Sequence, residues 1–286
     1  MAQRATSWPA AASARATPAL AGPRAGATVL ASLPQALYLR CDDGSVLPVV
    51  TGSGLRLPSS LVLGSKGPTD GWGVRPGDHV VVGAAEVVLP TATVRVVRTW
   101  VPVRFPVNAG TGASLPVVAA SASAQWRARA LAVARAALRG DDVTGAVAGM
   151  VGSGQGLTPS GDDVLCGLQL GLRPVPRAVT AVWAAVAPRL GATTSLSASL
   201  LAESAEGYAV PAVVHLGSVL AGAGVGPDSM AVLRRAVREV AGIGHSSGAD
   251  LLAGLAGALS ALAEPPAPRA HHSTGAVRPA LAGAHA

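Results

Sequence analysis

The spacing of apolar residues changes once along this chain of 286 residues, and the change limits the folds open to it. Between about residues 27 and 105, short stretches rich in Val and Leu alternate with turn residues, which is typical of strands. After a connector containing Pro and Gly, apolar residues recur every three or four positions, which is typical of helices. The sequence therefore predicts an α+β protein, with a small antiparallel β-rich N-terminal domain followed by an all-helical C-terminal domain.

We expect a disordered tail over 1–26, the β-rich domain over 27–105, a linker over 106–122, the helical domain over 123–263 and a second disordered tail over 264–286. The β-rich domain should be a half-barrel or sandwich of five to seven strands, with a hairpin turn at Asp43–Gly44. The expected strands are Ala36–Arg40, Val46–Thr51, Ser60–Gly64, His79–Val82 and Thr91–Val97. The expected helices are Ser123–Arg139, Val143–Met150, Ser160–Leu172, Ala178–Leu190, Thr193–Glu206, Val210–Leu220, Ser229–Ile243 and Ser247–Ala263.

The formal net charge of +7 suggests a nucleic-acid partner, but the distribution of charge argues against one. Five arginines lie in the two expected tails, and without them 22 − 5 = 17 basic residues face 15 acidic ones, about +2. Nor does the longest uncharged stretch, Tyr208–Gly226, suit a membrane span, because it contains Pro211 and several glycines. Cys41 and Cys166 have no metal-ligand or CxxC spacing and are expected to be reduced, which fits a cytoplasmic protein.

Two helix starts 87 residues apart resemble each other. SGDDVLCGL at Ser160–Leu168 and SGADLLAGL at Ser247–Leu255 share Ser, Gly, Asp, Leu, Gly and Leu at equivalent positions. Helix capping and close packing at Gly167 and Gly254 could account for the whole repeat. The surplus of glycines and hydroxyls in GSGQGLTPSGDD, Gly152–Asp163, favours a binding site instead, because glycine-rich loops that open helices bind anions.

We therefore predict a pocket between the two helix starts, which face each other across a pseudo-twofold axis. Carboxylates and one imidazole are the candidates for orienting a ligand, acting as a base or holding a cation such as Mg²⁺. The candidate catalytic residues are Asp162, Asp163, His245 and Asp250. The candidate ligand-binding residues are Gly154, Gly156, Thr158, Ser160, Gly161, Thr194, Ser197, Ser246, Ser247 and Gly248.

Two of these candidates, Thr194 and Ser197, belong to a hydroxyl-rich segment over Ala192–Gly207. Hydroxyls in such a helix more often cap it or bond back to its own carbonyls. Glu203 and Glu206 in the same segment are expected to be solvated. Known glycine motifs do not identify the ligand, because the glycines of Gly152–Gly156 follow a helical pattern and no Lys of a phosphate-binding loop comes after them.

At these segments the chain resembles a bacterial family that includes the AllH-type subunit of oxamate carbamoyltransferase. The resemblance rests on Gly152–Asp163, on T-x-x-S-A-x-L-L at Thr194–Leu201 and on G-H-S-S-G-x-D-x-L-x-G at Gly244–Gly254. It implies a role in allantoin and purine nitrogen catabolism, where three-subunit assemblies transfer a carbamoyl group between oxalurate and phosphate. It carries no assigned catalytic residues, so whether this chain itself is the transferase stays open.

The leading hypothesis is a carbamoyltransferase-type subunit that needs no cofactor and binds an anionic small molecule, with other such subunits as partners. A second hypothesis is a non-catalytic binding or scaffolding protein whose repeat stabilises a helical interface. A third is a Mg²⁺- or Mn²⁺-dependent enzyme that uses the Asp cluster.

Overall fold

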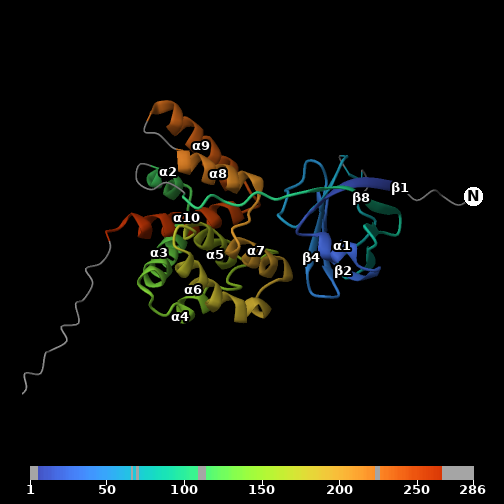
Figure 1. Cartoon of the computed structure of the whole chain (residues 1–286), viewed down its shortest axis with the longest axis horizontal. Coiled ribbons are helices and arrows are strands. Elements are labelled where there is room, and N and C mark those ends of the chain that lie inside the picture. Colours follow the sequence, from blue (N-terminus) through green and yellow to red (C-terminus); the bar gives the residue numbers. More distant parts are fainter. Residues whose placement is uncertain (1–5, 66, 69–70, 109–113, 223–225, 266–286) are drawn as a thin grey trace, which may run out of the picture.

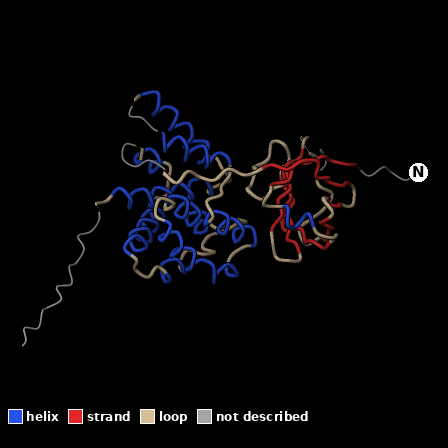
Figure 2. Tube along the Cα trace, in the orientation of Figure 1, coloured by secondary structure: helices blue, strands red, loops and turns tan. Residues whose placement is uncertain are grey.

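The computed structural model describes residues 6–65, 67–68, 71–108, 114–222 and 226–265. A β-barrel lies at one end of the molecule and a group of helices at the other (Figures 1 and 2). Within the described residues the strands are β1 (Thr6–Ser13), β2 (Ala25–Leu33), β3 (Ala36–Cys41), β4 (Val46–Val50), β5 (Leu61–Leu63), β6 (His79–Gly83), β7 (Glu86–Val88) and β8 (Ala92–Trp100).

The eight predicted helices are present in the described residues, but two short helices, Thr17–Ala21 and Leu115–Ala120, lie in stretches expected to be a disordered tail and a linker. The helices of the described residues are α1 (Thr17–Ala21), α2 (Leu115–Ala120), α3 (Ala124–Arg139), α4 (Thr144–Ala148), α5 (Ser160–Gly171), α6 (Pro176–Val186), the 3₁₀ helix η1 (Ala187–Ala192), α7 (Ser195–Ala205), α8 (Pro211–Gly222), α9 (Pro227–Ala241) and α10 (Ser247–Ala263).

The predicted antiparallel β domain is wrong in two respects. The described strands form a closed barrel in the order β1-β5-β4-β3-β2-β6-β7-β8, and both β1–β8 and β4–β5 are parallel pairs. Hairpin signals report only strands that are neighbours in sequence, so they miss a closing pair whose members lie at opposite ends of the barrel segment. The expected disordered stretch at 1–26 in fact supplies β1 and α1 from residue 6 onward.

The barrel is also not a separate domain beside the helices. Its interior is filled by one apolar cluster, which includes Leu37, Leu39 and Val94. Its outer face contributes Tyr38 and Val50 to a second cluster that also contains residues of α5, α7, α8, α9 and α10. Barrel and helices therefore share a hydrophobic core, and the expectation of a separate β-rich domain followed by an all-helical domain is wrong.

The buried centre of the helical part is α5, all of whose residues except Ser160 are buried. Its most extensive partner is α10, which runs through the helical part with α3 and α5 on one side and α8 and α9 on the other (Figure 1). The remaining apolar faces of α5 pack against α7 and α3. No helix in the described residues is both long enough and apolar enough to span a membrane.

Candidate functional site

The two echoed helix starts lie together, as the sequence repeat predicts. The hydroxyl oxygens of Thr158, just before α5, and Ser247, the first residue of α10, are 2.9 Å apart. At equivalent places in the first turns, a Cβ added to Gly161 or Gly248 would overlap the carbonyl oxygen of Met150 or Val240. These two glycines are therefore required by packing against the preceding segment.

The first-turn N–H groups of α5 and α10 are largely occupied by the chain's own carbonyls. Gly161 donates to Ser153 (2.8 Å) and Asp162 to Pro159 (2.9 Å), while Gly248 donates to Ile243 (3.0 Å) and Asp250 to Ser246 (2.9 Å). An anion at either helix start would have to compete with these bonds. The geometry thus points away from a backbone cradle and toward the side chains.

The carboxylate of Asp162 holds the glycine loop in place. It is 1% exposed and accepts hydrogen bonds from the N–H of Gly152 (2.8 Å) and the hydroxyl of Thr193. Both oxygens of this carboxylate are thus used to join the loop before α5 to the segment before α7. This arrangement favours a structural role for Asp162.

Asp163 and Asp250 occupy equivalent positions in the repeat and differ from Asp162. Both carboxylates are buried, and in each the Oδ2 atom has no hydrogen-bond partner in the described structure. Burial raises the pKa of Asp163 to about 7, against the opposing effect of the hydroxyls of Ser247 and Thr158, and the nearby carboxylate of Asp250 adds to the rise. Asp163 can therefore accept or donate a proton near neutral pH.

A cavity of about 220 Å³ lies beside Asp163, between the helices and the barrel. Its lining is mostly apolar side chains of three helices. Side chains of the barrel and of the loop between β4 and β5 complete it. The helical residues in the lining are Asp163, Cys166 and Leu170 of α5, Leu196, Leu200 and Ser204 of α7, and Ser247, Gly248 and Leu251 of α10. The barrel residues are Tyr38, Leu55, Leu57 and Pro58.

The cavity follows the length of α5. Asp163 and Leu170 are seven residues apart, which is about 10 Å along a helix. Thr194 donates to the carbonyl of Leu157 (2.5 Å), while the side chain of Gln169 donates to Ser204 (2.9 Å), so α5 and α7 run in the same direction. The cavity thus has a polar end at the helix starts and a second end near Tyr208, which follows α7.

Four of the predicted site residues, Thr158, Asp163, Ser247 and Gly248, line this cavity. The others lie elsewhere. His245 and Ser246 are exposed in the loop before α10, and Gly154 and Gly156 are exposed with positive φ angles in the loop before α5. Ser160 is half-buried at the start of α5, Thr194 caps α7 by accepting from the N–H of Ser197 (3.1 Å), and the buried hydroxyl of Ser197 has no partner in the described structure.

Glu203 is the residue that sequence reasoning missed. It was expected to be solvated, yet it is 4% exposed because the barrel covers this face of α7, and burial raises its pKa to about 7. It lines a second, more polar cleft of about 720 Å³, with Arg15 of the barrel part and Ser199 of α7. Glu203 is seven residues after Leu196 and three after Leu200, so the apolar period of α7 was the signal that could have indicated this burial.

Metal ligation by the acidic residues finds no geometric support. In the described part of the chain, no group of three or more His, Cys, Asp or Glu side chains is placed to hold a metal ion. Asp162 is turned to the glycine loop, away from a shared centre with Asp163. The Mg²⁺ site stays a prediction.

Comparison with known proteins bears on the helical part. Residues 150–259 match the model of the family described as oxamate carbamoyltransferase subunit AllH. All three motif segments of the predicted resemblance fall inside this range, so the AllH resemblance is confirmed there. The barrel lies outside the matched range. No curated protein and no solved structure gave a significant match.

Proposed function

We propose that this chain is a subunit of an oxamate carbamoyltransferase-type assembly in allantoin-derived nitrogen catabolism, and that the cavity beside Asp163 holds the carbamoyl- or amide-bearing ligand. The observation that carries the proposal is that residues of all three motif segments line the same cavity. The three AllH motif segments, far apart in sequence, supply Thr158, Asp163, Leu196, Leu200, Ser247 and Gly248 to one cavity.

The polar end of the cavity suits an amide. A charged Asp163 accepts hydrogen bonds from an amide or carbamoyl NH₂ group, and a protonated one donates to its carbonyl oxygen. The hydroxyls of Thr158 and Ser247 can either donate or accept a hydrogen bond. At about 220 Å³ the cavity is smaller than the roughly 300–1,000 Å³ that is common for drug-sized ligands, which favours a molecule as small as oxamate.

Two arginines lie near the opposite end of the cavity but do not line it. Tyr208 lines the cavity there, and the guanidinium carbons of Arg15 and Arg104 lie 4.2 Å and 4.8 Å from its ring centroid. Among the described lining residues of the cavity itself there is no Lys or Arg. We therefore assign phosphate binding to a partner subunit.

Titration calorimetry with oxamate tests the proposal. We expect wild type to bind oxamate, and Asp163→Asn to weaken that binding by about tenfold or more. Asp228→Asn is the matched control, because Asp228 is an exposed acid in the first turn of α9. The proposal fails if the folded wild type releases no heat with oxamate, or if Asp163→Asn binds as well as the control.

A scaffolding role is the second candidate, and the glycines favour it. Gly161, Gly248, Gly167 and Gly254 are each explained by close backbone approach, with no need of a ligand. A folded protein that binds neither oxamate, phosphate nor carbamoyl phosphate, with or without Mg²⁺, would support this role over ligand binding.

A further inference from the structure

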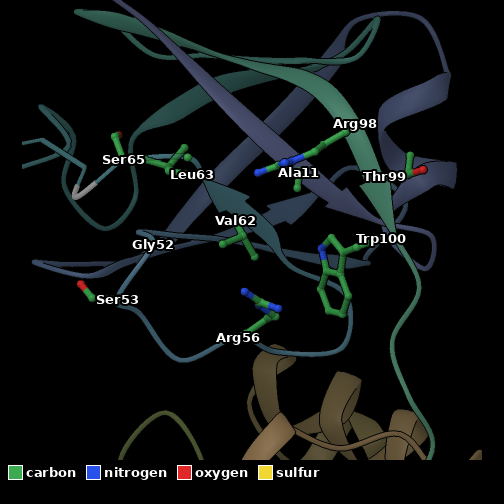
Figure 3. Close-up of a pocket in the computed structure, with 11 residues that line it drawn as sticks. Ala11, Gly52, Ser53, Arg56, Val62, Leu63, Ser65, Arg98, Thr99 and Trp100 are labelled. Atoms are coloured by element: carbon green, nitrogen blue, oxygen red, sulfur yellow. The ribbon is translucent and has the colours of Figure 1, made fainter.

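A third hollow lies on the outside of the barrel, apart from the cavity beside Asp163 and the cleft beside Glu203. It has a volume of about 760 Å³ and is bounded by β1, β5, β8 and the loop between β4 and β5 (Figure 3). It lies outside the residues that match AllH, so its argument is independent of the proposed function.

The floor of the hollow follows from strand register. Ala11 of β1 is paired with Val62 of β5 on one side and with Arg98 of β8 on the other. These residues share the outer face, and the small side chain of Ala11 leaves space between the larger ones (Figure 3).

A β-bulge turns Arg98 toward this space. In the β1–β8 pairing Ala10 faces Val96 and Ala11 faces Arg98, so Val97 is an extra residue. Without it, Arg98 would share the face of Val94 and Val96, which pack inside the barrel. The bulge moves the guanidinium to the outer face, as bulges near binding sites often do.

Two arginine side chains line the hollow. Figure 3 shows Arg98 and Arg56 reaching it from opposite sides of Val62. Neither forms an ion pair with any residue that the structure describes. Two like charges directed at one space repel each other unless an anion lies between them, and a planar guanidinium is well suited to bind phosphate or carboxylate.

Trp100 forms one wall of the same space. The guanidinium carbon of Arg56 is 5.4 Å from its ring centroid, and its indole Nε1 is buried with no acceptor in the described structure. Because this nitrogen is closed to solvent, a ligand in the hollow would contact the ring and not Nε1. The exposed indole surface offers an apolar contact for a flat group.

We propose that this hollow binds a phosphate monoester that carries a flat ring. The phosphate lies between Arg56 and Arg98, and the ring lies against Trp100. A phosphate monoester, with nearly two negative charges at neutral pH, matches two unpaired guanidinium groups better than a singly charged carboxylate does.

Titration calorimetry of the full chain with AMP and phenyl phosphate tests the proposal, with adenosine, inorganic phosphate and benzoate as comparison ligands. We expect at least one ring-bearing phosphate to bind, and the comparison ligands to bind about tenfold more weakly or not at all. Arg56→Gln and Arg98→Gln should each weaken binding by about tenfold or more. Trp100→Phe keeps an aromatic ring beside the ligand, so it should weaken binding less than either arginine variant does.

Arg95→Gln is the matched control, because Arg95 is also exposed on β8 but pairs with Glu86 (3.2 Å). It should bind as wild type does. The proposal is overturned if neither ring-bearing phosphate binds the folded protein, if adenosine or benzoate binds equally well, or if Arg98→Gln binds like Arg95→Gln. Circular dichroism of each variant separates lost binding from lost folding.

Discussion

Arg15, from the segment after β1, lies with its Nε atom 4.0 Å from Oε1 of Glu203 on α7, a distance too long for a hydrogen bond. The terminal nitrogens of Arg15 donate instead to both oxygens of Glu206, at 2.8 and 2.9 Å. Arg15 Nε and Glu203 Oε2 are both buried without partners in the described structure. Burial therefore outweighs the arginine in setting the pKa of Glu203, which is raised from 4.5 to about 7.

Stability should fall as pH rises through about 7. Because the folded state raises the pKa of Glu203, it binds that proton more tightly than the unfolded chain does, and the resulting stabilisation is present at low pH and lost above the folded pKa. Asp163, raised from 3.8 to about 7, acts with the same sign. We expect the free energy of unfolding in urea to fall, by on the order of 2–3 kcal/mol for each group, between about pH 5 and pH 8.

Glu203→Gln should flatten this dependence and unfold at higher urea than wild type at about pH 8. Glu239→Gln is the control, since Glu239 is an exposed partner of Arg235 on α9. A wild-type stability that rises from about pH 5 to pH 8, or an unchanged slope in Glu203→Gln, would contradict the prediction.

A methyl group added to a glycine where α5 and α10 cross should destabilise the fold. A Cβ on Gly167 would overlap the carbonyl of Leu251, and one on Gly254 would overlap that of Val164. We expect Gly167→Ala and Gly254→Ala each to cost about 3 kcal/mol or more in chemical denaturation. Gly145→Ala, in α4 with open space around it, should be neutral or slightly stabilising. Equal stabilities for Gly145→Ala and Gly167→Ala would show that the helices do not approach this closely.

Substitutions of Asp162 and Asp163 should have different effects. The first should lower stability, and the second should weaken ligand binding. Asp162→Ala leaves the Gly152 N–H and the Thr193 hydroxyl without their acceptor, at a cost of about 1–3 kcal/mol. Asp163→Asn removes a charge that burial disfavours and should be at least as stable as wild type near pH 8. Thermal denaturation of both, beside oxamate titration, checks this. The assignment fails if Asp163→Asn is the less stable of the two.

The segment before residue 14 should be essential to the barrel. Ala10 is 1% exposed and packs inside the barrel, so Ala10→Asp buries an unpaired carboxylate at an expected cost of about 3 kcal/mol or more. Ser7→Asp, at an exposed position of the same strand, should change stability by about 0.5 kcal/mol or less. If urea denaturation finds both variants equal to wild type, β1 does not close the barrel.

Local pattern was sufficient for most helices. α10 begins and ends at the predicted residues, and α5 is one residue shorter than predicted, because glycines and short polar residues mark their starts. β1 could not be recognised in the same way. Its sequence TSWPAAAS has few residues that favour strands, and its stability depends on pairing with β8, more than 80 residues later.

The sequence repeat made part of the site predictable. The repeat predicted that Thr158 and Ser247 lie in one site, and their hydroxyl groups are in contact. It did not separate the roles of Asp162 and Asp163, because adjacent residues on a helix face different neighbours. The apolar period of α7 could have indicated the burial of Glu203, but the position of the barrel that covers it has no local signal.

The parallel pairing of β1 with β8 also bears on how the chain folds during synthesis. The seam of the barrel joins residues 6–13 to residues 92–100, so it cannot form until nearly a hundred residues have left the ribosome. Until then β1 and the strands around it keep open edges, which are the usual templates for wrong pairing between chains. Seam closure over this long loop is the slow event we expect to limit folding of the barrel.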